Sequence, residues 1–251
     1  MRNSPLVTCT RLSPNRTSPR NHAIDTITIH CTAGQGTARQ ILAQRPFTTY
    51  DPVKGYSCNY AVGVDGSIGL CVDEGDRSWC SSNRVNDHRA ITIEVSSDRS
   101  HPYRVTDQAY EALIDLLVDI CRRRGIPRLL WRGDKRLVGQ VDKQNMTAHR
   151  WFAAKACPGD YLYSRFGEIA ARVNKRLEAN EEVTQEQFDA MMENYLARQR
   201  EKETSSWSRE AWERARAAGV FDGTAPQTPL SREQASLVLD RLGLLDRKGG
   251  G

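Results

Sequence analysis

The chain has 251 residues and a formal net charge of +5, and its 39% hydrophobic and 27% charged residues are typical of a soluble globular protein. No apolar run reaches the roughly 18 residues that a membrane-spanning helix requires, so we predict no membrane insertion. The start, MRNSPLVTCTRLSPNRTSPRNH, lacks the apolar core of a secretory signal; we expect the protein to stay in the cytosol where it is made until another factor releases it.

Short β-branched segments alternate with helical segments over the first two thirds of the chain. TITIH (residues 26–30) and AITIEV (90–95) have the composition of buried strands. CNYAVGVDGSIGLCV (58–72) carries an Asp-Gly pair, which predicts a hairpin of two short strands. TDQAYEALIDLLVDICRRR (106–124) is the clearest helix because its leucines lie at helical spacing and a glycine follows it. Further helical segments are predicted at 37–45 and 161–178.

The composition changes near Asn180, where EEVTQEQFDAMMENYLARQREKE begins. Thr184 with Gln187, and later Ser231 with Gln234, have the spacing of capping boxes that start helices. We therefore predict three parts: a main domain over 1–178, a helical linker over 179–203 and a helical module over 204–251. The expected fold is α/β, a central mixed β-sheet flanked by helices with a small all-helical C-terminal module.

The excess of basic residues lies in the larger part of the chain. Residues 1–177 carry 26 Lys or Arg against 17 Asp or Glu, whereas residues 178–251 carry 10 against 14. The positive charge of residues 1–177 is consistent with binding of a polyanionic partner, either nucleic acid or an anionic cell wall. It is equally consistent with ordinary charged residues on a solvated surface. Basic residues do not interleave with aromatic ones, and the paired ligand spacing of structural zinc is missing, so we predict no nucleic-acid binding.

The stretch MTAHRWFAAKACPGD (146–160) combines His149 and Cys157, two residue types that zinc prefers as ligands. A catalytic zinc usually has three protein ligands and an open position. His30 is the best third candidate, because a ligand that ends an apolar strand is held by the core yet faces a cleft. The alternative interpretation is a surface histidine and a buried structural thiol.

Two further residues fit chemistry at such a site. Lys155 lies two residues before Cys157, where a cation can face developing negative charge. Glu94 lies on the strand AITIEV, on the face opposite Ile91 and Ile93, where a carboxylate could act as a base.

Four blocks now carry a resemblance: TITIHCTAG, CNYAVGVDGSI, DRSWCSSNRVNDHRAITIEV and TAHRWFAAKACPGDYL. In this order they resemble the zinc N-acetylmuramoyl-L-alanine amidases, above all those of phages and prophages, over about residues 5 to 177. The resemblance implies the fold that these amidases share with peptidoglycan-recognition proteins. It also implies one Zn²⁺, bound by His30, His149 and Cys157, with Lys155 stabilising the oxyanion and Glu94 activating the water.

The sequence departs from the family pattern at one position. Some relatives carry a tyrosine where this chain has Cys58, and strand alternation places Tyr60 on the same face as Cys58. Trp79, Asn86 and His88 precede the Glu94 strand, where a wall of the substrate groove is expected. Trp79 could stack on a sugar ring or pack under the loop.

The seven cysteines predict no disulfide framework, because their number is odd and no pair has CxxC spacing. Cys31 adjoins His30, and neighbours on a strand point to opposite faces, so we expect Cys31 to face away from the zinc.

Residues 205–245 resemble one surface-layer homology repeat. The matching features are Trp207, Ala211, the GVFDG turn and the SREQ that opens a final helix. Several such repeats together bind cell-wall polymers. With one repeat, three interpretations compete: binding of a secondary wall polymer, self-association into a homo-oligomer, or a packing appendage. The first is slightly favoured, and the second would relieve the small core of so short a module.

The resemblance thus implies a peptidoglycan hydrolase that cleaves the amide between N-acetylmuramic acid and L-alanine, and we expect a phage or prophage endolysin. Such a protein would remain in the cytoplasm of the bacterial host until it is released to the wall. A bacterial autolysin is the alternative within this enzyme class. A non-catalytic peptidoglycan-binding protein is a further alternative, disfavoured because the ligands, Glu94 and Lys155 are all present.

Overall fold

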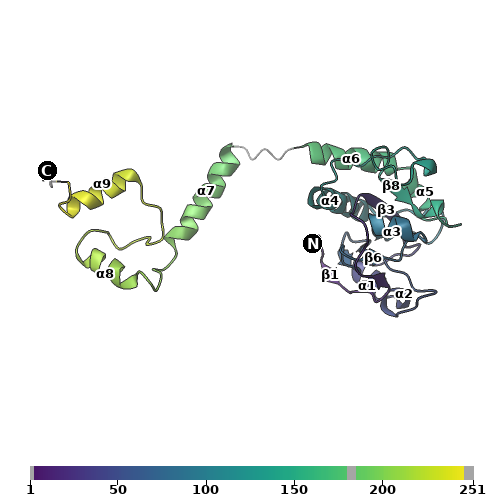
Figure 1. Ribbon diagram of the computed structural model, residues 1–251, viewed down its shortest axis with the longest axis horizontal. Helices are drawn as coiled ribbons and strands as arrows, with labels where there is room; N and C mark the ends of the chain where they lie inside the picture. Colours follow the sequence, from purple (N-terminus) through teal and green to yellow (C-terminus); the bar gives the residue numbers. More distant parts are fainter. Residues whose placement is uncertain (1–2, 180–184, 246–251) are drawn as a thin grey trace. The chain divides into compact units, whose positions relative to one another are not determined.

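The computed structural model describes residues 3–179 and 185–245 (Figure 1). It forms two compact units, Met1–Asn180 and Glu181–Gly251. The boundaries of the three parts stay predictions, and Thr184 of the first capping box lies outside the described residues. No helix in the described ranges is long and apolar enough to cross a membrane.

A six-stranded sheet in the order β1-β5-β4-β7-β3-β8 forms the centre of the first unit. It is mixed, because β4 pairs with β5 antiparallel while the pairs β1·β5, β4·β7, β7·β3 and β3·β8 are parallel. Its strands are β1 Cys9–Thr10, β3 Thr26–Cys31, β4 Tyr60–Val62, β5 Ile68–Leu70, β7 Ala90–Val95 and β8 Met146–Ala148. A separate two-stranded ladder joins β2 Arg16–Thr17 to β6 Arg77–Ser78. The predicted α/β class with a mixed sheet is confirmed.

Helices cover both faces of this sheet (Figure 1). The long α4 and α6 pack on the face that carries Ile27, Ile29, Ile91 and Ile93, and enclose the main hydrophobic core. A smaller core around Ile41 lies on the other face, where α1 packs against β4 and β5. The helices of this unit are α1 Ala38–Leu42, α2 Arg45–Thr48, α3 Arg84–Arg89, α4 Asp107–Arg124, α5 Gly159–Tyr163 and α6 Phe166–Glu178, with short 3₁₀ turns at Lys135–Leu137 and His149–Trp151.

The structure differs from two of the predicted helices. The segment 37–45 is helical only to Leu42, because Gln44 is extended and Pro46 lies in the first turn of the separate helix α2. The segment 161–178 is split near Arg165, whose backbone leaves helical geometry and lets Phe166 become fully buried.

Helix α4 is fixed at both ends. The Thr106 side chain accepts a hydrogen bond from the Ala109 N–H, and Gly125 ends the helix at φ 66°. Its last turn supplies Arg123 and Arg124, which form ion pairs with the fully buried carboxylate of Glu74. A charge buried in this way is tolerated because it is paired on several sides.

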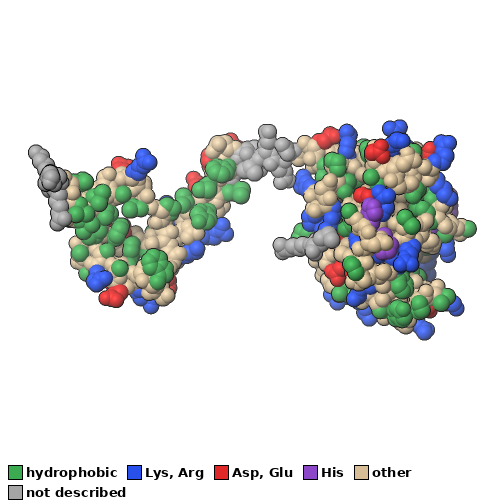
Figure 2. All heavy atoms as spheres, in the orientation of Figure 1, with side chains coloured by type: hydrophobic (Ala, Val, Ile, Leu, Met, Phe, Trp, Pro, Cys, Tyr) green, Lys and Arg blue, Asp and Glu red, His purple; other side chains and the backbone are tan. Residues whose placement is uncertain are grey.

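The second unit contains α7 Gln185–Arg200, α8 Arg209–Ala217 and α9 Arg232–Arg241. The helix–turn–helix predicted from GVFDG and SREQ is present: Ser231 and Gln234 form a capping box at the start of α9. Trp212 stacks on Phe221 at 5.2 Å, whereas Trp207 is 88% exposed and is one of several hydrophobic side chains of this unit that face solvent (Figure 2). The likeness to a surface-layer repeat stays a prediction.

We expect Leu117→Ala to lower the free energy of unfolding of the first unit by about 2–5 kcal/mol, because the side chain is fully buried between α4 and the sheet and its removal leaves a cavity. Urea unfolding followed by circular dichroism measures this. Gln108→Ala, at an exposed position of the same helix, is the control and should change the value little. Equal losses in the two variants would contradict the assignment of the core.

Candidate active site

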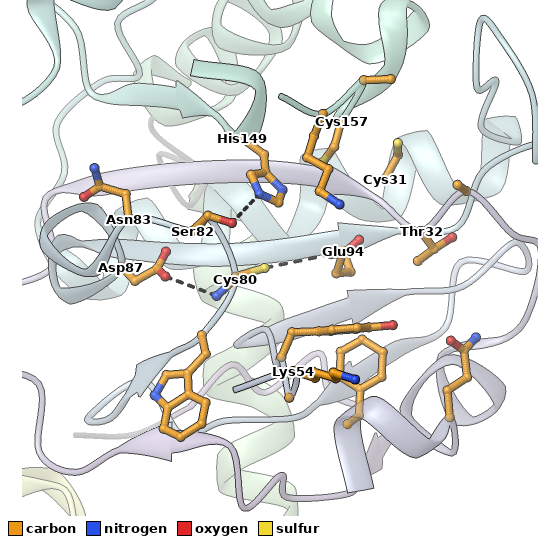
Figure 3. A pocket seen from close by; sticks show the side chains of 18 of the residues that line it. Cys31, Thr32, Lys54, Cys80, Ser82, Asn83, Asp87, Glu94, His149 and Cys157 are labelled. Atoms are coloured by element: carbon orange, nitrogen blue, oxygen red, sulfur yellow. Dashed lines mark hydrogen bonds between the residues drawn. The ribbon is translucent and has the colours of Figure 1, made fainter. Parts of the chain in front are cut away.

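A groove of about 820 Å³ opens on the sheet face opposite the main core, beside the carboxyl ends of β3 and β7 (Figure 3). Side chains from the β3 end, the loop before β4, the loop before α3, β7 and the segment after β8 line it. Because carboxyl ends of parallel strands meet at one edge of a sheet, residues far apart in sequence come together here.

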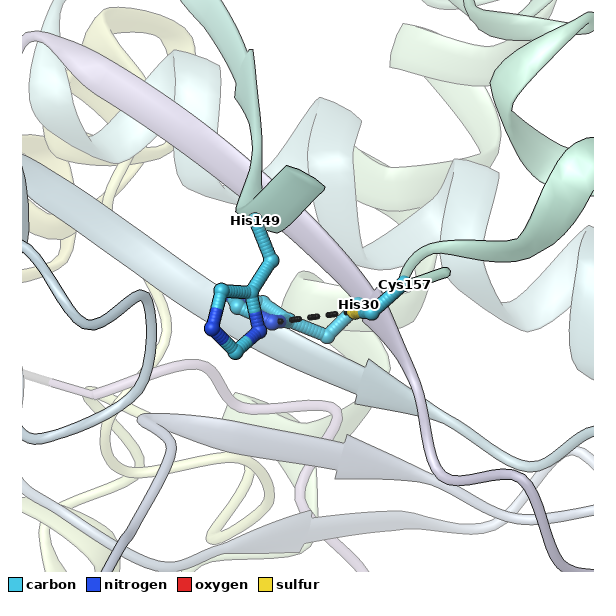
Figure 4. Close-up of side chains that lie close together, drawn as sticks. All are labelled: His30, His149 and Cys157. Carbon is cyan, nitrogen blue, oxygen red and sulfur yellow. Dashed lines mark hydrogen bonds between the residues drawn. The ribbon is translucent and has the colours of Figure 1, made fainter. Parts of the chain in front are cut away.

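Three side chains converge at the wall of this groove (Figure 4): His149 and Cys157 line it, and His30 is fully buried behind them. One candidate ligand atom from each lies within 4.8 Å of the other two. The Cys157 Sγ lies 3.3 Å from the His30 Nδ1, and the two imidazole rings are 5.1 Å apart between centroids. These are the three residues that the sequence predicts as zinc ligands.

The register of the sheet explains this convergence. Ile29 of β3 is opposite Ala148 of β8, so the residue after each, His30 and His149, lies at the same end of neighbouring strands. The segment after His149 then folds back on itself. The Arg150 N–H donates to the Cys157 carbonyl, which returns the thiol to the two imidazoles.

Electrostatics prepares the imidazoles to act as neutral ligands. His30 is fully buried, and desolvation lowers its pKa well below the ordinary value. Burial also lowers the pKa of His149, with Lys155 adding to the effect. Neutral imidazoles with a free lone pair are the form that binds a metal ion.

The thiol of Cys157 requires a positive charge to ionise. A hydrogen bond with the Cys31 thiol and burial both raise the pKa of Cys157. A cation at the convergence point would offset this cost, because a metal lowers the pKa of a thiol that it binds. Two nitrogens and one sulfur form a donor set that fits zinc, and three protein ligands leave a coordination position open.

Glu94 faces the groove from β7, directly across from His30 in the strand register (Figure 3). Its Oε1 accepts a hydrogen bond from the Cys80 thiol at 3.8 Å. Its Oε2 is enclosed and has no hydrogen-bond partner among the described residues. Burial, with Cys31 nearby, raises the pKa of Glu94 to about 8.

His30, Cys80 and Glu94 form a second group whose candidate ligand atoms lie within 4.8 Å of one another. Both groups share His30, so they are alternative positions for one cation at this histidine. The first group has two histidines and the sequence neighbourhood that the family resemblance singles out.

Lys155 is exposed and lines the groove on the same segment as Cys157. Its positive charge contributes to the lowered pKa of His149. Trp79 also lines the groove, half-buried, with its Nε1 donating to the Thr17 hydroxyl at 3.0 Å and the Tyr50 ring 6.2 Å away.

The structure does not bring Asn86 and His88 to the groove. Both belong to α3 and are 5% exposed. The Asn86 amide bonds to the Thr28 and Ser81 hydroxyls, and the His88 Nδ1 accepts the Asn21 N–H. Helix α3 turns these two side chains inward: Asn86 ties the helix to β3 and β8, and His88 ties it to the loop at Asn21.

The expected relation between Cys58 and Tyr60 is wrong. Cys58 packs in the smaller core near the groove, whereas Tyr60 is buried in the main core and donates to the Glu74 carboxylate. Regular strand geometry begins only at Tyr60, so alternation does not extend back to Cys58. Tyr56 lines the groove instead, 40% exposed and edge-on to Phe47 at 4.9 Å.

Cys31 lies on the core face of β3, as alternation predicts, but its thiol also lines the groove and bonds to Cys157. Cys157 contacts both His30 and Cys31 because it lies over the end of the strand. The sequence analysis also missed Cys80 and Ser82, which contact Glu94 and His149. The sequence signal for both residues was the polar segment CSSN (80–83) just before α3, whose composition indicates a loop.

The family model for N-acetylmuramoyl-L-alanine amidase (Amidase_2) matches residues 20–160. This segment contains all three converging residues, Glu94 and Lys155. The chain belongs to this amidase family. Membership supports a peptidoglycan amidase activity.

Solved structures with a similar backbone include PlyL, at 16% identity, covering 69% of this chain and 97% of that one, with a TM-score of 0.43. AmpD, as its selenomethionine derivative, has 18% identity, covers 68% and 99%, and has a TM-score of 0.47. The amidase LysC from Clostridium intestinale has 17% identity, covers 66% and 97%, and has a TM-score of 0.42. No curated protein matches the sequence.

We expect Asn86→Ala to lower the free energy of unfolding by about 1–3 kcal/mol, because it leaves buried hydroxyls of Thr28 and Thr147 short of a partner. The apparent KM of the amidase for peptidoglycan should not change. Trp79→Ala should do the reverse, raising KM with little loss of stability. Urea titrations and initial rates on both variants test this. A raised KM in Asn86→Ala would show that Asn86 contributes to the substrate groove after all.

Proposed function

We propose that this chain is a zinc-dependent amidase that uses His30, His149 and Cys157 to hold one Zn²⁺. The observation that carries the proposal is the convergence of two imidazoles and a thiol, within 4.8 Å of one another, inside the part of the chain that matches the family model. When bound, zinc would polarise the amide carbonyl and lower the pKa of a water at the open position.

Glu94 is the residue that we propose to move protons. Its enclosed Oε2 has no protein partner in the described part of the chain, so it is available to a water or to the substrate. Burial raises its pKa above the ordinary carboxyl value, and this makes the carboxylate form a stronger proton acceptor than an exposed carboxylate. In the reaction it would accept a proton from the attacking water and deliver it to the departing L-alanine nitrogen.

Lys155 is proposed to stabilise the tetrahedral oxyanion. It is exposed to the groove and has a cationic head on a flexible stem beside Cys157. A positive charge that meets the oxygen as its negative charge develops favours the transition state over the bound substrate. Trp79, with Tyr50 beside it, offers an aromatic surface on which a sugar ring could lie.

The biological role that we propose is lysis of a bacterial host as a phage or prophage endolysin. The four sequence blocks resemble those of phage and prophage amidases, which supports this role. The protein would then act on the wall only after leaving the host cytoplasm. An autolysin would use the same site. A binding protein without catalysis fits less well, since Glu94, Lys155 and two of the three proposed ligands line the groove, and the third ligand lies directly behind them.

For the second unit we propose contact with the wall, either with peptidoglycan or with a secondary polymer. Its apolar side chains that face solvent support a binding surface, among them Trp207 at 88% exposure. Self-association into a homo-oligomer through the same side chains is the second candidate. The unit's excess of acidic residues favours specific contacts over crude attraction to an anionic polymer.

Digestion of purified Gram-positive peptidoglycan should release free L-alanine amino termini, identified by mass spectrometry. A chelator should abolish the release, and added Zn²⁺ should restore it. Cys157→Ser should be inactive and should not retain zinc, whereas Cys121→Ser, which alters a buried thiol under α4, should cleave normally if it folds. New reducing sugar ends would identify a glycosidase instead, and binding without cleavage would favour a recognition protein.

We expect Glu94→Gln to lower kcat about 10²–10⁴-fold, the usual value of general acid–base catalysis. Lys155→Met should lower it about 10²–10³-fold, as for loss of one oxyanion donor. Neither variant should lose bound zinc, because neither residue belongs to the proposed ligand set. Single-turnover rates and metal analysis on the same samples check this. Loss of zinc in Glu94→Gln would place the ion in the group of His30, Cys80 and Glu94.

We expect Trp207→Ala to weaken binding of an inactive Cys157→Ser background to whole walls about 10-fold, as for an exposed aromatic hot spot. Co-sedimentation with walls measures this, and Glu193→Ala on the exposed surface of α7 is the control. Unchanged wall binding together with a change in sedimentation coefficient would assign the surface to self-association.

A further inference from the structure

Ser82 lines the groove but has no role in the proposed reaction. Its hydroxyl lies 3.0 Å from the His149 Nε2, as the dashed line in Figure 3 shows. Its backbone has φ 58°, in the left-handed region that a serine rarely occupies. A residue held in an unfavourable conformation next to a functional side chain indicates that the surrounding structure imposes that position.

The loop that carries Ser82 is fixed from both sides. The Asp87 carboxylate, 2% exposed, accepts the N–H groups of Cys80 and Ser81 and the Ser81 hydroxyl. On the other side, the Asn83 side chain caps α3 by accepting the Asn86 N–H. Four polar contacts therefore hold the backbone on either side of Ser82, so its hydroxyl is presented from a rigid support.

The contact occupies the Nε2 of His149 and leaves Nδ1 to face the other ligands. A neutral imidazole carries one N–H and one lone pair. If Nε2–H donates to the Ser82 hydroxyl, the lone pair is at Nδ1, and this nitrogen is the one left for the convergence point. In Figure 4 a nitrogen of the His149 ring points toward His30 and Cys157. The hydrogen bond also stops rotation of a half-buried ring.

We propose that Ser82 is a positioning residue for the amidase reaction: it fixes the tautomer and orientation of His149 for metal binding. This inference rests on the proposed function, because it requires His149 to be a zinc ligand. Partners of this kind typically contribute 10–100-fold to metal affinity. Ser82 has no part in the proposed proton transfers, and in this proposal its effect passes through His149.

The full-length chain with Zn²⁺ alone is the system for the test, and competition with a chromophoric chelator gives the zinc Kd. Ser82→Ala should raise the Kd about 10–100-fold. Ser82→Gly, which also loses the hydroxyl but removes the backbone strain, should raise it equally while folding at least as stably. Ser82→Asn, which tolerates positive φ and keeps an acceptor, should recover part of the affinity. Ser100→Ala, at an exposed position, is the control.

Nitrogen chemical shifts of His149 in the zinc-free chain give a second measurement. They should show a single Nε2–H tautomer in the wild type and a mixture in Ser82→Ala. The variant His149→Ala distinguishes a failure of the proposed ligand set from a failure of the proposed role of Ser82. An unchanged Kd in His149→Ala would overturn the proposed ligand set. A large loss in His149→Ala, with no change in Kd or tautomer in Ser82→Ala and Ser82→Gly, would overturn the role of Ser82 alone.

Discussion

Parallel pairing of β3 with β7 and β8 decides where the reactive side chains lie. The register sets His30 opposite Glu94 and places His149 one residue beyond the end of the β3·β8 ladder. A slip of one residue would turn every side chain of β3 to the other face and remove His30 from the groove. The isoleucines that alternate with these polar residues prevent such a slip, because they are buried against α4 and α6.

The groove face of the sheet is polar, so its buried polar groups need hydrogen-bond partners. Buried hydroxyls and amides must find partners inside the protein. Thr28 bonds to Thr147, and Asn86 bridges both strands from α3. These bonds join β3, β8 and α3 into one support beneath the metal-binding residues. The loop before α3 then extends from this support to Glu94 and His149 through Cys80 and Ser82.

Much of this arrangement could be predicted from the sequence where local pattern and tertiary structure agree. Apolar and polar residues alternate clearly in the strands TITIH and AITIEV. Their bounds were therefore predictable, and so was the position of Glu94 on the face opposite the isoleucines. The three residues that converge could be chosen from a short list, because few histidines lie at strand ends. The predicted helix at 106–124 was found nearly as expected because it has its own cap and stop.

The remaining features depend on contacts that no local pattern encodes. Asn86 and His88 were expected at the groove, but the α3 turn buries them. Tyr60 was expected on the same face as Cys58, but its hydroxyl donates to the buried Glu74 carboxylate, which pairs with arginines of α4. The contact of Cys31 with Cys157 arises because the chain crosses the end of β3, a feature of the long segment after β8.

The central claim is that one metal ion is held by His30, His149 and Cys157, and cobalt substitution tests it most directly. Co²⁺ bound to a thiolate gives a ligand-to-metal charge-transfer band, and a four-coordinate site gives strong visible absorption. Titration of the zinc-free chain should produce both, at one ion per chain. The charge-transfer band should vanish in Cys157→Ser and persist in Cys80→Ser. A band that persists in Cys157→Ser and vanishes in Cys80→Ser would contradict the claim and place the ion with Cys80 and Glu94.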